Sequence, residues 1–338
     1  MKRLIAEWEP QRAVMLTWPR TNGDFAATHA AVEACFETIA RAVARYEDLI
    51  ISTDTAAQGD RLQGRLADDP NLGRMRFHVA PNNDVWARDH GPIGIATSDG
   101  PMLLKFGFDG WGGKHPAERD NALTPALAAQ GAFGELPLQT VDMVLEGGAI
   151  DTDGAGTLLA TASSALDRTR NPELDQAAIE ALLSRHCGIR RFLWLHHGQL
   201  QGDDTDGHID TLARFTNGHT IAYQQSGGAK DPNHAALRAL ETELKALRDE
   251  DGTPYKLVPL PWPGLHLSAD GQPLPAGYAN FLIINGAVLL PTYGVAADAE
   301  AIAVLQELFP RRQIVPVDCQ ALIRQYGSLH CVTMNIPA

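Results

Sequence analysis

The sequence lacks several features that mark common classes of protein. Among its 338 residues there are only four cysteines, at positions 35, 187, 319 and 331, and none forms a CxxC pair. This argues against a dense disulfide framework and against a structural zinc site. No apolar run approaches the length of a membrane span, and the first apolar stretch already ends at Glu7, too early for a signal peptide. We therefore expect a reduced, cytoplasmic protein without a membrane partner.

Positive charge is also in short supply. The chain carries 28 lysine and arginine residues against 41 aspartate and glutamate residues, a formal net charge of −13. This excess of acid argues against a nucleic-acid partner, because nothing offsets the repulsion from the phosphate backbone. It favours a small cationic substrate instead. With 44% hydrophobic and 20% charged residues, the chain has enough apolar material to bury a sizeable core.

The sequence does contain a repeated pattern of turns and short apolar runs. Asp99-Gly100, Asp153-Gly154, Asn217-Gly218 and Asn285-Gly286 each lie between two apolar runs. Such dipeptides favour tight β-hairpin turns, because both residues tolerate a positive φ. Helical stretches separate the hairpins, and a further β-like run follows each helix, at 49–52, 192–195, 256–260 and 314–317. The predicted unit is therefore a hairpin, a helix and a strand.

Apolar side chains at helical spacing indicate where the helices lie. They form stripes within residues 32–43, 179–183, 237–247 and 302–309. Asn171-Pro172 and Asp231-Pro232 are predicted to begin the second and third of these helices, as an N-cap residue followed by proline.

The pattern indicates about five units, provided that the N-terminal run 13–16 completes the last hairpin, 328–336. Pairing of the two ends would close a ring and remove exposed sheet edges. A doubly wound sheet is the alternative, but the hairpins would then have to be insertions. No linker or low-complexity tract divides the chain, so we expect one catalytic domain over residues 1–338.

Chemically active residues occupy matching places in these units. Four motifs directly precede or open an apolar run: Trp86-Ala-Arg-Asp-His-Gly-Pro92, Leu145-Glu-Gly-Gly148, Asp206-Gly-His-Ile-Asp210 and Leu329-His-Cys331. Side chains at equivalent positions of successive units can converge on one axis, although they lie far apart in the sequence. The pattern predicts a catalytic centre.

These motifs, extended to Gly202–Asp210 and to Gly327–Thr333, resemble those of the agmatine deiminase and bacterial peptidylarginine deiminase family. This family lies within the guanidine-modifying α/β-propeller superfamily, and the similarity covers essentially the whole chain in family order. The resemblance implies an α/β fold, a five-bladed pseudo-symmetric propeller of the pentein type. It also implies a hydrolase that converts a guanidinium group to a ureido group and releases ammonia, with no cofactor and no metal.

The residues themselves fit this chemistry. A guanidinium group is planar, permanently charged and rich in donors, so carboxylates are its best partners. Asp89 and Asp210 are the candidates for holding its plane, and Trp86 is a candidate aromatic wall, because guanidinium stacks on aromatic faces. Cys331 is the predicted nucleophile, since a thiolate attacks an electrophilic carbon and forms a covalent intermediate.

His208 is the predicted general acid and base. An imidazole whose pKa lies near the working pH can protonate the leaving ammonia and then activate the hydrolytic water. Glu146 is expected to orient His208 or to stabilise its cationic form. That contact would raise the pKa of His208 and favour a thiolate–imidazolium pair with Cys331.

Each assignment has a structural alternative. Arg88 and Asp89 could form only a surface ion pair, which contributes little. Trp86 could be part of the core, and Glu146 could simply bind turn amides. Three of the cysteines are expected to be small buried apolar residues without a chemical role: Cys35, Cys187 and Cys319.

The substrate is open among agmatine, free arginine and peptidyl-arginine. We expect agmatine, converted to N-carbamoylputrescine on a route to putrescine and the polyamines, because secreted peptide-modifying relatives would carry an export signal. The motif at 327–337 departs from the Gly-Gly-Gly-Asn-Ile-His-Cys-Ile-Thr-Gln-Gln form of many agmatine deiminases. An amidinotransferase, a cysteine amide hydrolase and a non-catalytic binding propeller are the other function classes. The oligomeric state is open, with a homodimer among the options.

The acidic stretch 202–210 also bears comparison with a metal site. Aligning Gly207 with the glycine of an EF-hand loop places Gly202 at the first ligand position and Ala213 at the last, so the calcium pattern fails at both ends. A guanidinium group already carries the charge that a Lewis acid would supply. A divalent cation between Asp89 and Asp210 would repel it.

We therefore expect full activity after exhaustive chelation, and inhibition by zinc through Cys331 and His208. Ammonia release measured before and after chelation checks this. Inactivation by the chelator, reversed by one equivalent of a divalent metal, would contradict the metal-free chemistry and favour a metal-dependent guanidine hydrolase.

Overall fold

The computed structural model describes residues 2–338. Within them, five sheets share one topology, in which an antiparallel pair of strands is followed by a strand parallel to the second. In spatial order their strands are β1 (Arg3–Leu4), β5 (Ile93–Thr97), β6 (Gly100–Gly107) and β7 (Leu138–Val144); β8 (Ile150–Thr152), β9 (Thr157–Thr161) and β10 (Arg191–Leu195); β11 (Ala213–Asn217), β12 (Thr220–Gln224) and β13 (Lys256–Leu260); β16 (Leu282–Ile284), β17 (Ala287–Thr292) and β18 (Gln313–Asp318); and β19 (Thr333–Pro337), β2 (Gln11–Thr17), β3 (Asp48–Thr53) and β4 (Met75–Val79). A short hairpin of β14 (His266–Leu267) and β15 (Pro273–Leu274) stands apart.

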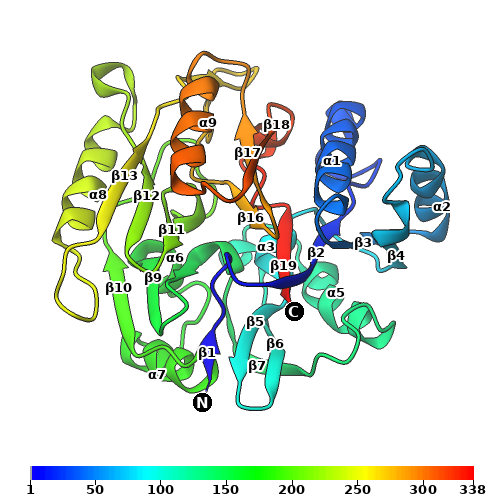
Figure 1. Ribbon diagram of the computed structural model, residues 1–338, viewed down its shortest axis with the longest axis horizontal. Helices are drawn as coiled ribbons and strands as arrows, with labels where there is room; N and C mark the ends of the chain where they lie inside the picture. The colour runs from blue at the N-terminus through cyan, green and yellow to red at the C-terminus, as the bar shows by residue number, and fades with distance from the viewer. Residues whose placement is uncertain (1) are drawn as a thin grey trace.

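In each of these sheets a helix connects the second strand to the third. These helices are α5 (Glu118–Ala129), α7 (Gln176–Cys187), α8 (His234–Ala246), α9 (Ala297–Leu308) and α1 (His29–Ala44). The remaining helices are α2 (Ala56–Arg65) and the one-turn helices α3 (Ala87–His90), α4 (Gly110–Gly113) and α6 (Ala162–Ala165). The longer helices lie toward the outside of the view and most strands lie inside them (Figure 1).

The hairpin turns and the pairing of the chain ends match the sequence predictions. All four Asx-Gly dipeptides fall at the turn that joins the antiparallel pair of a sheet, with Gly100 as the first residue of β6 and Asn217 as the last of β11. The strand β19, red in Figure 1, pairs antiparallel with β2, so that Thr333 lies opposite Leu16. Because every one of the five sheets contains an antiparallel pair, the doubly wound alternative is wrong.

The predicted starts of two helices are wrong. The helix α7 begins at Gln176, and Asp175 caps it by accepting a hydrogen bond from the Ala178 amide at 2.9 Å. The Asn171 side chain instead binds both backbone groups of Val144, at 2.9 Å each.

The Asp231 side chain closes a turn ahead of α8, accepting from the Gly227 and Asn233 amides at 3.0 and 2.8 Å. Asx side chains satisfy any nearby amide that the turn presents, so an Asx-Pro pair does not by itself fix a helix start. The helix α5 was not predicted, because Pro125 lies inside it and its apolar residues form no clear stripe.

The largest apolar cluster joins the two ends of the chain. It combines β2 and α1 with β17, α9 and β18, through residues such as Leu16, Phe36, Leu289 and Leu305. Cys35, Cys187 and Cys319 are buried among apolar neighbours, as expected. In the part of the chain that the structure describes, no helix has the length and apolarity needed to cross a bilayer.

Removing buried volume from this cluster should cost far more stability than removing exposed volume. Leu305→Ala, at a fully buried position of α9, should lower the free energy of unfolding by about 2–5 kcal/mol. Leu267→Ala is the matched control, because Leu267 is 52% exposed on β14, and it should change stability by less than about 0.5 kcal/mol. Urea unfolding curves of the two variants test this, and equal losses would show that α9 does not anchor the core.

Candidate active site

Every predicted site residue lies directly before the first strand of a sheet, as the sequence pattern indicated. Asp89 is in α3, ahead of β5, and Glu146 precedes the 3-10 turn η3 (Gly147–Ala149) and β8. His208 and Asp210 flank the start of the turn η4 (Ile209–Thr211), ahead of β11, and Cys331 precedes β19. Equivalent places in four different sheets thus carry these side chains.

Three of these side chains converge on Gly148. A Cβ atom at this glycine would lie 2.6 Å from His208 Nδ1, 2.7 Å from Asp89 Oδ1 and 3.2 Å from Asp210 Oδ2. A side chain at this position would therefore collide with the imidazole and both carboxylates. The Gly148 amide also donates a hydrogen bond to Asp89 Oδ1 at 3.0 Å. The Glu-Gly-Gly motif is thus explained by the close approach of the two acids and the histidine.

Cys331 lies against the same group. Its Sγ is 3.8 Å from Asp210 Oδ2 and 3.4 Å from Asn280 Oδ1, and its carbonyl accepts a hydrogen bond from the Arg88 amide at 3.1 Å. Burial raises the pKa of the Cys331 thiol well above its ordinary value, and the negative charges of Asp210 and Asp89 raise it further. The sulfur is therefore a thiol at neutral pH.

Asp89 is a buried acid rather than half of a surface ion pair. Its Oδ2 accepts a hydrogen bond from Trp111 Nε1 at 3.0 Å. Burial raises the pKa of Asp89 well above its ordinary value, and the charges of Asp210 and Glu146 add to this. The neighbouring Arg88 points elsewhere, donating to Asn335 Oδ1 at 2.6 Å. The surface-pair alternative is therefore wrong.

Asp210 has the opposite character. Burial alone would raise its pKa, but the hydrogen bond and charge of His330, at 2.7 Å from Oδ2, outweigh burial and lower the pKa of Asp210. Its Oδ1 is buried and has no hydrogen-bond partner among residues 2–338. The two acids thus differ, because Asp89 takes up a proton readily whereas Asp210 stays ionised.

His208 differs from its prediction in both partner and charge. The carboxylate in ion-pair range of its ring is that of Asp89, 3.5 Å from Nδ1, whereas Glu146 pairs with Arg170 Nε at 2.7 Å. Burial lowers the pKa of His208 to about 3. The expectation that Glu146 raises this pKa and favours a thiolate–imidazolium pair is therefore wrong. The imidazole is neutral at pH 7, and its Nε2 is buried with no partner among the described residues.

Glu146 lies wholly inside the molecule. Burial raises the pKa of its carboxyl group, and the charge of Arg170 only partly opposes this. Its Oε2 has no partner in residues 2–338. Among residues 2–338, no amide of the η3 turn caps onto its side chain, so the turn-binding alternative does not account for it.

A cavity opens onto the sulfur. It spans about 610 Å³ including its mouth, and its lining includes Cys331, Asp89, Trp86 and Trp111. The Trp86 indole packs directly against Gly327, and its Nε1 donates to Asp84 Oδ2 at 2.8 Å. Trp86 is therefore both a packed residue and a wall of the cavity. The remaining lining is rich in acids: Asp24, Asp84 and Asp204.

Several residues of the site were not predicted. Asn280 lies just before β16, the first strand of the sheet that contributes none of the predicted residues. Asp89 and Cys331 occupy the same place in their sheets. The repeat itself was the signal that could have identified it. Trp111 lies in the one-turn helix α4 and Arg170 in a turn before α7. Both lie outside the repeated position, and no local pattern marks them. The region shows no group of three or more histidine, cysteine or acidic side chains arranged to hold a metal, within the described part of the chain.

Comparison with known proteins agrees with this geometry. The chain is 32% identical to the agmatine deiminase of Stutzerimonas stutzeri, over 98% of this chain and 95% of that protein. A solved protein from Porphyromonas gingivalis, described as a candidate arginine deiminase, is 47% identical with a TM-score of 0.94, covering 100% of this chain and 98% of its own. The agmatine deiminase of C. jejuni, solved with substrate bound, is 30% identical with a TM-score of 0.92, covering 100% and 97%.

The family model of the Porphyromonas-type peptidyl-arginine deiminases matches residues 3–337. With a match over nearly the whole chain, and with relatives above 30% identity over almost their full length, the protein belongs to the Porphyromonas-type peptidyl-arginine deiminase family.

Proposed function

We propose that the protein hydrolyses agmatine to N-carbamoylputrescine and ammonia, through a covalent intermediate on Cys331. The observation that carries this is the convergence of a histidine and two carboxylates on Gly148, with the Cys331 sulfur beside one of the carboxylates, next to a cavity that several acids line. The agmatine deiminases among its relatives support it.

The proposed binding step uses the difference between the two acids. The ionised Asp210 attracts the guanidinium group, and its unpartnered Oδ1 accepts an N–H. Approach of the cation makes ionisation of Asp89 favourable, so that both carboxylates hold the plane of the group. The central carbon is then left open to the sulfur, and Trp86 lies beside the substrate chain.

The proposed chemical steps begin with a thiol. The substrate cation offsets the burial and the acid charges that raise the pKa of Cys331, and the neutral His208 takes the thiol proton at its free Nε2. The thiolate bonds to the guanidinium carbon, and one nitrogen leaves as ammonia after receiving the proton from His208. Water then attacks the same carbon and gives one proton to His208. The C–S bond breaks with its electron pair on sulfur, which takes that proton back from His208, and the second proton of the water leaves with ammonia as ammonium, which yields the neutral ureido product.

Glu146 retains its proposed place in this centre. Its unpartnered Oε2 can accept a hydrogen bond from the hydrolytic water or from the leaving nitrogen. Arg170, which pairs with Glu146, also binds Asp206 Oδ2 at 2.9 Å and so ties the η3 side of the site to the loop that carries His208.

We propose that the five similar sheets are the blades of one ring, a pentein-type propeller that forms a single catalytic domain. The repeated placement of Asp89, Asp210, Asn280 and Cys331 ahead of a first strand supports this, as does the pairing of β19 with β2. In such a ring, equivalent strand starts face the common axis.

Agmatine is preferred because it carries a second positive charge at the far end of its chain. Asp24, Asp84 and Asp204 also line the cavity and would attract that ammonium group. Free arginine places a carboxylate in the same region, which these acids would repel. Arginine or peptidyl-arginine is the second candidate, favoured by the family model and by the relative that is 47% identical. An amidinotransferase would need an amine acceptor in place of water.

An ammonia-release screen of the wild type over agmatine, arginine, a peptidyl-arginine and n-butylguanidine tests the function. Agmatine should give the highest kcat/KM, and Cys331→Ser should abolish release. Asp24→Asn should lower kcat/KM for agmatine roughly three- to tenfold by removing one partner of its ammonium group, and should barely affect n-butylguanidine, which lacks that group.

Asp60→Asn is the matched control for this charge change, because Asp60 is exposed on α2 and does not line the cavity. A higher kcat/KM for arginine or the peptide than for agmatine would contradict the proposed substrate and would still support the deimination chemistry. If no guanidine in the screen released ammonia, both the proposed substrate and the proposed deimination chemistry would be contradicted.

The activation of the thiol by a bound cation gives a second prediction. Cys331 should react with 2-chloroacetamidine, a cation, roughly ten- to a hundredfold faster than with the neutral 2-chloroacetamide, because a charge-assisted contact with the two acids is gained. Asp89→Asn should reduce this ratio. Peptide mapping identifies the modified cysteine, and labelling at Cys35, Cys187 or Cys319, or equal rates for the two reagents, would contradict the proposal.

A further inference from the structure

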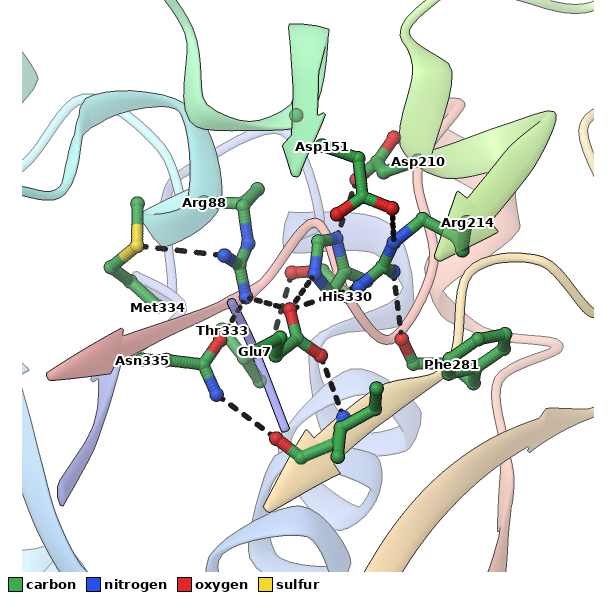
Figure 2. A network of polar contacts seen from close by, with 12 residues as sticks. Glu7, Arg88, Asp151, Asp210, Arg214, Phe281, His330, Thr333, Met334 and Asn335 are labelled. Carbon is green, nitrogen blue, oxygen red and sulfur yellow. Dashed lines mark hydrogen bonds and ion pairs between the residues drawn. The ribbon is translucent and has the colours of Figure 1, made fainter. Parts of the chain in front are cut away.

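One histidine outside the predicted set lies between two buried carboxylates. His330 Nδ1 is 2.7 Å from Asp210 Oδ2, and His330 Nε2 is 2.7 Å from Glu7 Oε2 (Figure 2). An ionised carboxylate oxygen only accepts hydrogen bonds, so both ring nitrogens have to donate. The hydrogen-bond network therefore indicates a doubly protonated imidazolium with two carboxylate partners.

The Glu7 end of this bridge is fixed by charge and by the backbone. Glu7 Oε2 accepts a hydrogen bond from Arg214 Nη2 at 2.9 Å and lies 3.6 Å from Arg88 Nη2. Its Oε1 accepts from the Ile283 amide at 2.7 Å. The charges of Arg214, His330 and Arg88 outweigh burial, so the pKa of Glu7 is held well below its ordinary value. Glu7 is therefore an ionised anchor.

Arg214 is itself immobilised. It donates to the Phe281 carbonyl at 3.0 Å, lies 3.3 Å from Asp151 Oδ2, and stacks over the Phe281 ring at 5.1 Å. Figure 2 shows Arg214, Glu7 and His330 as one connected group, with Asp210 and Asp151 next to it. The chain of contacts thus runs from the backbone beside β16, through Glu7 and His330, to one oxygen of Asp210.

The other end of the bridge faces the reaction. His330 occupies Asp210 Oδ2 and leaves Oδ1 buried and without a partner among residues 2–338. The charge of Asp210 raises the pKa of the nearby Asp89. Two buried carboxylates with no other charged partner would share one proton. The imidazolium of His330 lies against Asp210, so Asp210 and not Asp89 keeps its negative charge.

We propose that His330 is a positioning residue, whose imidazolium form ties Asp210 to the anchor Glu7, keeps Asp210 ionised and presents its Oδ1 to the substrate guanidinium. This rests on the proposed function only in that a guanidinium is the group bound. The charged groups around His330 are Asp210 and Glu7 in direct contact, with Arg88, Arg214 and Asp151 behind Glu7.

Two substitutions at this position separate positioning from simple packing. In His330→Asn the amide nitrogen takes roughly the place of Nδ1 and can still donate to Asp210. In His330→Gln it takes roughly the place of Nε2 and can donate only to Glu7. Both variants lose the imidazolium charge, so each controls for that loss in the other, and His330→Asn removes the larger volume.

His330→Gln should lower kcat/KM roughly ten- to a hundredfold, chiefly by raising KM, because a charge-assisted contact to the substrate-binding acid is lost. His330→Asn should lose clearly less. Without its donor, Asp210 binds a proton at higher pH, so activity that needs the ionised form is lost as pH falls through the raised pKa. The acid limb of kcat/KM in His330→Gln should therefore move upward by about one unit or more. Equal losses in both variants with an unmoved limb would overturn the proposal.

A readout independent of the natural substrate keeps this test separate from the proposed function. The rate of Cys331 modification by 2-chloroacetamidine should fall in His330→Gln, while the rate with neutral 2-chloroacetamide should not. This pattern would support the positioning role even if agmatine were not turned over, and parallel changes with both reagents would overturn it.

The wild-type protein provides a measurement that does not depend on any variant folding. In 15N-histidine NMR spectra at pH 7, both ring nitrogens of His330 should show the shifts of protonated nitrogen, assigned by their loss in either variant. A neutral tautomer at that pH would overturn the proposal.

Discussion

The cost of burying several carboxylates close together is the constraint on which this structure depends. Five acids at the centre are at least nine-tenths buried: Glu7, Asp89, Glu146, Asp151 and Asp210. Removing such a charge from water is expensive unless a donor or a cation compensates it. Nearly all of the unusual features of the centre are such compensations, including the buried arginines, the indole hydrogen bond to Asp89 and the glycine that lets the acids approach a backbone amide.

The buried carboxylates differ in the partners that compensate their charge. Glu7 and Asp151 are paired with Arg214, and Glu146 is paired with Arg170, so these acids form the frame. Asp89 receives only neutral donors and is left with a raised pKa, whereas Asp210 receives His330 and stays ionised. Two chemically identical side chains thus acquire different roles from their surroundings alone. A cationic substrate is the partner that would complete the balance.

Much of this could be predicted from the sequence, for physical reasons that are local. Asx-Gly turns, apolar spacing and the position of each motif ahead of a strand depend on neighbouring residues, and they located the hairpins, four of the five connecting helices and the elements that carry Asp89, His208 and Cys331. The partners of these residues were harder to predict from the sequence. Arg170 reaches Glu146, and Glu7 reaches His330, across long sequence separations, and no local pattern encodes such a contact.

The protonation states were the least predictable part. His208 was expected to become cationic through a contact with Glu146, yet its burial dominates and keeps it neutral. Burial depends on how whole sheets pack, so it cannot be read from the residues around a motif. His330, by contrast, follows directly before Cys331 and was passed over because its two carboxylate partners lie on distant segments.

The pairing of β19 with β2 has a consequence for folding kinetics. The strand that follows Cys331 is held in place by a strand from the opposite end of the chain, with Thr333 opposite Leu16. Such contacts are slow to form, because bringing distant parts of the chain together costs loop-closure entropy before the contact contributes any stabilisation. The position of the nucleophile therefore depends on a pairing between the two ends of the chain, and we expect a partly folded chain without this pairing to lack a complete reactive centre.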